Sequence, residues 1–316
     1  MMPLRIIASS DVPMIKQGYV EMEIGFSTMH RFEPVLYSQD ITMREVPNSR
    51  RKMKWLESRI NEEWDTYIDR VAAEMRQSGR LPVYDERNGR RALYEEREHG
   101  KAPVRYNGDL ARFEGIGYGD GKAEISWSRE EYAAHNTTKG LYLQRSRRAL
   151  PMTACGVLTC KKDGKEVIVV EERDSIDTDG SDPVLFVPAG YLECTSIGVL
   201  NPVETVAKEL EEELAGVSAD ADKLMAFSLI HSLQNHEMVT MVHVPASSDF
   251  SGIRSGKGTG RLRVIGTGYQ GAVDDAKEIY LLGKQNGLLV GGIVDFIGYR
   301  YGAKAREQAL ADIVGW

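Results

Sequence analysis

The sequence is short of the residues that mark several large classes of protein. It has only three cysteines in 316 residues, Cys155, Cys160 and Cys194, and no pair of them has Cys-x-x-Cys spacing. An odd number without that spacing predicts neither a disulfide framework nor a structural zinc site. A reducing compartment such as the cytoplasm suits this composition best.

Long hydrophobic runs and an excess of positive charge are also missing. The longest apolar stretch, residues 287–299, is rich in glycine, contains Asp295 and is too short to cross a bilayer. The N-terminal residues lack the basic and apolar segments of a secretory signal. A net charge of -7 gives no general attraction to nucleic acid. We therefore expect no membrane span and no specific nucleic-acid partner, and an anionic substrate would need metal ions or local lysines and arginines.

The chain is long enough for two domains, since 316 residues exceed the usual size of one. A basic stretch at residues 145–148, followed by Pro151, is the boundary that we favour. We expect an N-terminal α+β accessory domain over residues 1–147 and a second, mixed α/β domain over residues 148–316.

Two segments of the first half have clear patterns. Residues 51–79 place apolar side chains, from Trp55 to Met75, at steps of three and four, which predicts a long amphipathic helix ending near Gly79. The apolar stripe fits a contact with a second copy in a homodimer, but burial against its own domain is the interpretation that we favour. Residues 115–127 predict strands joined by glycine turns.

The second half begins with three predicted strands, at residues 152–159, 166–170 and 184–187. The third strand runs into a turn made of Pro188, Ala189 and Gly190. A helix follows, with Asn201 as its cap, Pro202 at its first position and Glu204 three residues after the cap. Gly216 marks its expected end.

One face of this helix is acidic. Glu209, Glu212 and Glu213 lie three or four positions apart, so their side chains are neighbours. Like charges repel there, and a hard cation would remove the repulsion by binding the carboxylate oxygens. A solvated acidic face is the alternative, and it would be preferred if the helix stood alone.

The order of strand, glycine turn, loop and glutamate helix resembles the Nudix box, Gly-x5-Glu-x7-Arg-Glu-U-x-Glu-Glu-x-Gly-U, in which U is aliphatic. The match covers about thirty residues, 188–217. It departs from the pattern in a loop with about four extra residues, near 195–199, and by Leu200 at the first glutamate and Ala215 at the late glycine. The positions that follow the pattern are Gly190, Lys208 in place of arginine, Glu209, Leu210, Glu212 and Glu213.

The resemblance implies a Nudix-like α/β/α sandwich with a mixed sheet, and a metal-dependent hydrolase that cleaves the diphosphate bond of a small-molecule nucleotide. The turn Pro-Ala-Gly is reminiscent of members that hydrolyse nucleotide sugars such as ADP-ribose. Mg²⁺ or Mn²⁺ is expected, because carboxylate ligands suit hard cations. The implied metal ligands are Glu209, Glu212 and Glu213, with Gly190 and Glu193 as further contacts.

The resemblance also implies an acid later in the chain, as catalytic base or additional ligand, and Glu278 and Asp275 are equal candidates. Arg254, Lys257 and Arg261, in a glycine-rich loop, are candidates for binding substrate phosphates. Glu204 either closes the helix cap, which we favour, or supports the site by pairing with Lys208.

Two other functions stay open. An altered Nudix box is also expected of a degenerate module that binds a nucleotide without cleaving it. Gly266, Gly268 and Gly271 satisfy Gly-x-Gly-x-x-Gly after a strand, which would suit an oxidoreductase, but we favour a hairpin turn because the ribose-binding acid expected about twenty residues later is missing.

Overall fold

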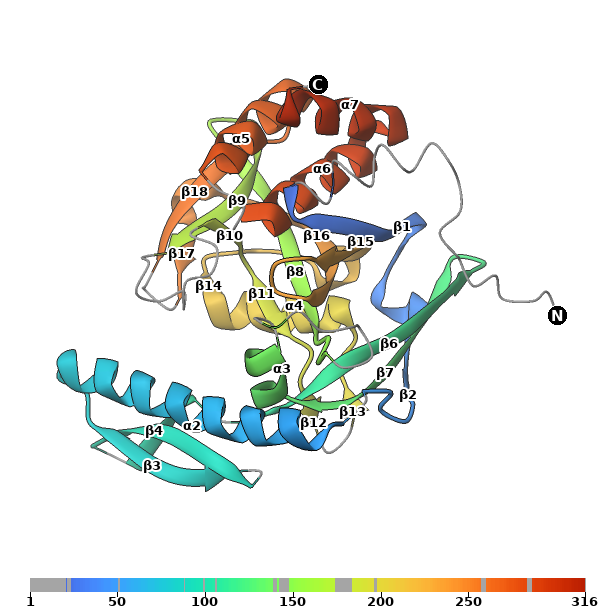
Figure 1. The fold of residues 1–316 in the computed structure, drawn as a ribbon. Helices are drawn as coiled ribbons and strands as arrows, with labels where there is room; N and C mark the ends of the chain where they lie inside the picture. Colours follow the sequence, from blue (N-terminus) through green and yellow to red (C-terminus); the bar gives the residue numbers. More distant parts are fainter. Residues whose placement is uncertain are drawn as a thin grey trace.

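The computed structural model of the protein is a mixed α/β structure (Figure 1). The residues that it describes are 21, 24–50, 52–87, 89–98, 100–105, 107–138, 141, 148–173, 184–195, 198–256, 260–282 and 286–315.

A large mixed sheet organises the molecule. Its central pair, β16 (Glu237–Asp249) and β8 (Met152–Lys162), is parallel, whereas the other pairs are antiparallel. The three strands predicted between residues 152 and 187 are confirmed within this sheet. The order is β1 (Phe26–Leu36), β15 (Met225–Ser232), β16, β8, β9 (Lys165–Arg173) and β10 (Val184–Phe186), with β11 (Ala189–Tyr191) paired to β8 and β18 (Gly260–Gly266) to β9.

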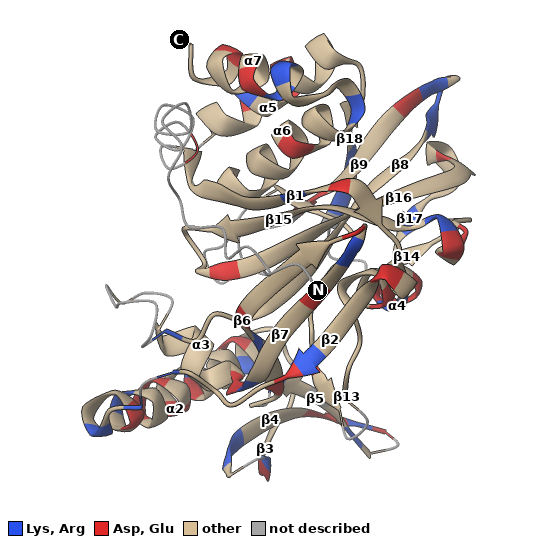
Figure 2. Ribbon diagram, turned by 90° about the vertical axis from the view of Figure 1, so that its right-hand side faces the viewer, with Lys and Arg blue, Asp and Glu red and all other residues tan. Residues whose placement is uncertain are grey.

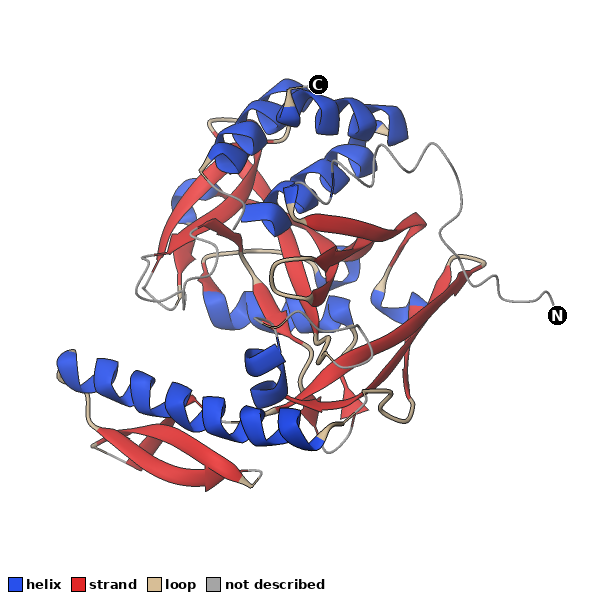
Figure 3. Ribbon diagram, in the orientation of Figure 1, coloured by secondary structure: helices blue, strands red, loops and turns tan. Residues whose placement is uncertain are grey.

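Helices cover both faces of the sheet, because alternate residues of each strand point to opposite sides. On β9, Ile168 and Val170 pack with α5 (Tyr269–Leu281), α6 (Gly287–Tyr301) and α7 (Ala303–Val314). Val167 and Val169 pack on the other side, with α4 (Pro202–Glu213) and with strands β6 (Asp109–Gly119) and β7 (Lys122–Glu131). Figure 3 shows the three C-terminal helices above the sheet and α4 below it.

The glycine-rich apolar stretch forms the buried helix α6. A Cβ atom on Gly291 would lie 2.6 Å from the ring of Phe26, and one on Gly292 would overlap the ring of Phe186. These glycines therefore let the helix lie directly against the sheet. Within the described residues, no helix combines the length and the apolar character needed to cross a bilayer.

The N-terminal half is built on α2 (Lys54–Gln77), the predicted amphipathic helix, which is followed by Gly79 with a φ of 75°. Its apolar stripe packs against α3 (Tyr132–Thr138) and β4 (Arg90–Arg97). The stripe thus gives no support to a homodimer. The assignment of Trp55 to this stripe is wrong, because its side chain is 52% exposed. Two three-stranded sheets complete this half: β2 (Ile41–Glu45) with β7 and β6, and β3 (Pro82–Arg87) with β4 (Arg90–Arg97) and β5 (Gly100–Arg105).

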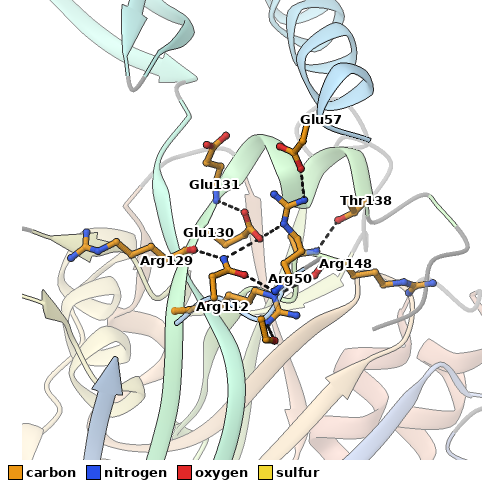
Figure 4. Close-up of polar contacts among 12 residues, drawn as sticks. Arg50, Glu57, Arg112, Arg129, Glu130, Glu131, Thr138 and Arg148 are labelled. Carbon is orange, nitrogen blue, oxygen red and sulfur yellow. Dashed lines mark hydrogen bonds and ion pairs between the residues drawn. The ribbon is translucent and has the colours of Figure 1, made fainter. Parts of the chain in front are cut away.

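A buried ionic network holds α2 to β7 (Figure 4). The guanidinium of Arg50 bonds to the carboxylate of Glu130 and, at 2.8 Å, to that of Glu57 on α2. Arg112 on β6 donates to the backbone oxygen of Arg148 at 3.3 Å. Buried charges need such partners, so removing one of them is costly.

The first strand does not follow the expected domain division. β1 pairs with β15, with Phe26 opposite Ser232, and so belongs to the large sheet rather than to a separate N-terminal unit. Arg306 on α7 reinforces this by donating to Glu21 at 2.7 Å and to Asp295 at 2.6 Å. For the rest of the N-terminal half, the boundary near residue 148 stays a proposal.

Candidate active site

The glutamate helix α4 begins as the sequence predicts. The side-chain oxygen of Asn201 accepts the N–H groups of Val203 and Glu204 at 3.0 Å, and Glu204 accepts the N–H of Asn201 at 3.0 Å. The second oxygen of Glu204 accepts the hydroxyl of Ser38 at 3.2 Å. Glu204 therefore closes the cap, as we favoured, and the alternative pairing with Lys208 is wrong.

The end of α4 differs from the prediction. The helix stops at Glu213, and Leu214 and Ala215 form a short strand, β14 (Leu214–Ala215), paired with β17 (Arg254–Ser255). Gly216, which we expected to end the helix, instead has a φ of 77° and passes so close to the backbone of Gly252 that no Cβ atom fits there. Two further short strands, β12 (Cys194–Thr195) and β13 (Gly198–Val199), form the loop before α4.

The glycine turn lies directly against the acidic face of α4. A carboxylate oxygen of Glu213, which is 5% exposed, accepts the N–H of Ala189 at 3.0 Å. A Cβ atom on Gly190 would lie 2.5 Å from the carboxyl carbon and one oxygen of Glu209. Only glycine permits this approach. Two glutamates and the glycine of the predicted motif therefore meet in space.

Lys208 provides the positive charge among these acids. Its ammonium nitrogen lies 3.5 Å from an oxygen of Glu212 and 3.9 Å from one of Glu209. Burial opposes the charged form, but the carboxylates of Glu212, Glu209 and Glu193 outweigh it and raise the pKa of Lys208. The ammonium thus offsets the repulsion for which we expected a metal ion. Figure 2 shows the acidic positions gathered on α4.

The donors have the right chemistry for Mg²⁺ or Mn²⁺, because all of them are carboxylates. Their arrangement does not complete a metal site. Among the residues that the structure describes, no three His, Cys, Asp or Glu side chains lie together in a way that could hold a metal ion. Glu213 uses an oxygen on Ala189, and Glu212 is paired with Lys208. As they stand, these residues do not fit a bound cation.

Asp275 and Glu278 are not brought to this site. Both lie on α5, whose buried residues pack on the face of the sheet opposite to α4. Asp275 accepts the N–H of Gly266 at 2.8 Å, and an oxygen of Glu278 lies 3.5 Å from the guanidinium of Arg263. The catalytic base predicted from this segment must therefore come from elsewhere.

The Gly-x-Gly-x-x-Gly segment connects β18 to α5, so the hairpin turn that we favoured is wrong. A Cβ atom on Gly266 would lie 3.5 Å from the backbone of Gly271, and one on Gly271 would lie 3.7 Å from Gly266, so both would be in ordinary van der Waals contact and close packing does not require either glycine. The preceding strand is antiparallel to β9. This is not the parallel unit that binds dinucleotides.

The basic residues predicted to bind phosphate are placed separately. Arg254 lies on β17 beside the end of α4, but its guanidinium donates to the backbone oxygens of Ser251 at 2.6 Å and Ile253 at 2.8 Å. Arg261 lies on β18, opposite Glu172. Lys257 is outside the described residues.

Sequence analysis missed one buried acid near this site. Glu171 on β9 is 3% exposed and accepts the hydroxyl of Ser255 at 2.9 Å, next to the strand that ends α4. It alternates with Val167 and Val169, so it points to the α4 side of the sheet. A charged residue at an inward position of the apolar run Val-Ile-Val-Val-Glu was the signal that could have found it.

Comparison with known proteins adds little. No family model matches the sequence, and no curated protein matches it. A crystal structure of a C. elegans Ap4A hydrolase binary complex is similar over 49% of this chain and 100% of its own, with 11% sequence identity and a TM-score of 0.32. A likeness this low carries no argument about function, so only this chain's own residues can do so.

Proposed function

We propose that this chain is a divalent-cation-dependent hydrolase that cleaves the diphosphate bond of a nucleoside diphosphate linked to another group, such as a nucleotide sugar or ADP-ribose. The observation that supports this most is the contact of Gly190 with the carboxylate of Glu209, beside the bond from Ala189 to Glu213. These residues are distant in sequence, and they are the ones whose spacing resembles the Nudix box.

The chain's own groups suit hydrolysis of a diphosphate. In the proposed reaction a glutamate of α4 takes a proton from an attacking water molecule, as a general base does. We assign this role to Glu209 or Glu213, which contact the glycine turn, rather than to Glu212, whose side chain is 50% exposed. Arg254 stands beside the end of α4, where its guanidinium suits a phosphate.

Cation dependence belongs to the proposal because the donors are carboxylates. The Lys208 ammonium, which now lies among Glu193, Glu209 and Glu212, has to move aside before a cation can be held there. A substrate bound at Arg254 brings further oxygen donors, which the described residues by themselves do not supply in a group of three.

The test is cleavage of a panel of ADP-ribose, NADH, nucleotide sugars and nucleoside triphosphates, followed by phosphorus NMR. With Mg²⁺ or Mn²⁺, we expect the diphosphate signals of one substrate class to be replaced by phosphomonoester signals, and EDTA to stop the reaction. Binding without cleavage of any compound, with either metal, would remove the enzyme assignment.

A nucleotide-binding module without catalysis is the second candidate. The observation that favours it is the Lys208 ammonium, which already neutralises the acids of α4. This candidate predicts that nucleotide affinity, measured by calorimetry, is the same in EDTA and in Mn²⁺. An affinity that needs the metal would favour the hydrolase.

A further inference from the structure

Three polar side chains from separate elements meet on the far side of the glycine turn. The hydroxyl of Tyr191 on β11 donates to a carboxylate oxygen of Glu237 on β16 at 2.7 Å. The same oxygen lies 3.2 Å from Nε2 of His135 on α3, and that nitrogen lies 3.3 Å from the Tyr191 oxygen. His135 is 3% exposed and Glu237 is 8% exposed, so the cluster is inside the protein.

The positions of the protons follow from the donors and acceptors. A carboxylate oxygen only accepts, and the single hydroxyl proton of Tyr191 is directed at Glu237. Nε2 of His135 must therefore carry a hydrogen and share it between Glu237 and the Tyr191 oxygen. Burial and the nearby charge of Glu237 raise the pKa of Tyr191 well above its ordinary value, so this phenol stays a donor.

The cluster connects the N-terminal half to the turn. The ring of Tyr132 on α3 meets that of Tyr191 edge to face, with centroids 5.8 Å apart, and meets that of Trp64 on α2 in the same way at 6.1 Å. Successive side chains of a strand point to opposite faces. Tyr191 therefore points away from α4, while its neighbour Gly190 faces Glu209.

We propose that Tyr191 is a positioning residue whose bonds to Glu237 and His135 hold β11 so that Ala189 and Gly190 face the glutamates of α4. Through His135, α3 of the N-terminal half fixes the turn. The kinetic consequence rests on the proposed function, whereas the effect on the backbone of β11 does not.

The first experiment compares Tyr191→Phe with the matched control Tyr269→Phe. Each removes one hydroxyl that donates to a carboxylate, since Tyr269 on α5 donates to Asp312 on α7 at 3.1 Å. Hydrogen exchange followed by mass spectrometry is measured on the peptide that covers residues 188–193. We expect Tyr191→Phe to exchange about tenfold faster there, and Tyr269→Phe to exchange as the unaltered protein does.

The second experiment measures the kinetics of the substrate found in the panel. Tyr191→Phe is expected to lower kcat about tenfold with KM changed less than about twofold, because substrate contacts remain while the acids are misplaced. Tyr269→Phe is expected to keep both values. A loss of kcat in Tyr269→Phe as large as in Tyr191→Phe would reduce the effect to general stability and overturn the proposal.

Two variants of Glu237 keep the proposal testable if Tyr191→Phe fails to fold. Glu237→Gln keeps a carbonyl acceptor for the Tyr191 hydroxyl and should leave exchange of 188–193 slow, whereas Glu237→Leu should speed it. Slow exchange of this peptide in Glu237→Leu, or in a folded Tyr191→Phe, overturns the positioning role. If the unaltered protein cleaves no compound of the panel, the proposed function fails, and the exchange result still decides the role of Tyr191.

Discussion

Replacing Gly190 by alanine tests the contact on which the site depends. The new Cβ atom would lie 2.5 Å from the Glu209 carboxyl group, whereas ordinary contact begins at 3.4 Å. The carboxylate must therefore retreat by about 0.9 Å, the difference between these two distances. Because Glu209 is flexible at that end, we expect a loss of only about 1 kcal/mol in the free energy of unfolding. A displacement of about 1 Å in a catalytic group is expected to lower turnover about 100-fold.

Urea denaturation and phosphorus NMR measure these two effects separately. Gly271→Ala is the matched control, because a Cβ atom on this residue of α5 would lie 3.7 Å from the nearest atom, the Cα atom of Gly266, which is ordinary contact. It should keep full turnover and gain about 0.5 kcal/mol in stability, as alanine does when it replaces a helical glycine. A Gly190→Ala protein that is folded and fully active would refute the assignment of Glu209 to the reaction.

Three further predictions follow from the same site and from one buried histidine. Glu213→Gln should lower turnover at least about 100-fold with little change in urea denaturation, because the amide still accepts the Ala189 N–H. The matched change Glu211→Gln, at an exposed position of the same helix, should keep turnover. An equal loss of turnover in both variants would contradict a specific role for Glu213. Lys208→Met should lower the melting temperature in EDTA, because the acids of α4 lose their ammonium partner. Adding Mn²⁺ should then raise the melting temperature of the variant more than that of the unaltered protein. Equal rises in melting temperature would contradict the idea that Lys208 neutralises these acids. Burial, helped by the charge of Arg300, lowers the pKa of His243 to about 4. Below about pH 6.5 the unfolded chain therefore binds a proton at His243 that the folded protein does not bind. The free energy of unfolding should fall as the pH is lowered from 6.5 to 4, with a slope of up to about 1.4 kcal/mol per pH unit from this residue. The slope measured by urea denaturation should be shallower in His243→Gln, and an unchanged slope would contradict the lowered pKa.

Local patterns predicted several of the elements because their causes are local. The apolar spacing of residues 51–79 gives α2, and the cap formed by Asn201 and Glu204 starts α4 at the expected residue. The end of α4 was missed because Leu214 pairs with Ser255, 41 positions later, and such pairing overrides local helix signals. The same reason explains why sequence analysis did not place β1 in the large sheet, since its partner β15 lies far along the chain.

The candidate site was predicted as far as one segment of sequence could show it. Spacing along α4 and the turn before it indicated Gly190, Glu209 and Glu213, which do meet. Asp275 and Glu278 could not be excluded, because sequence alone does not tell which face of the sheet a later helix covers. Glu171 and Tyr191 were missed for the converse reason: their partners, Ser255 and Glu237, come from strands far along the chain.

The place of β1 has a consequence for the way in which the protein is made. Phe26 pairs with Ser232, so 206 positions separate the strand from its partner. At synthesis rates of about 5–20 residues per second, roughly 10–40 seconds pass between the synthesis of β1 and that of its partner β15. During that time its apolar positions, Phe26, Phe32 and Leu36, are without the sheet that later buries them. The nascent chain is then exposed to aggregation at its N-terminal end, where a chaperone would act.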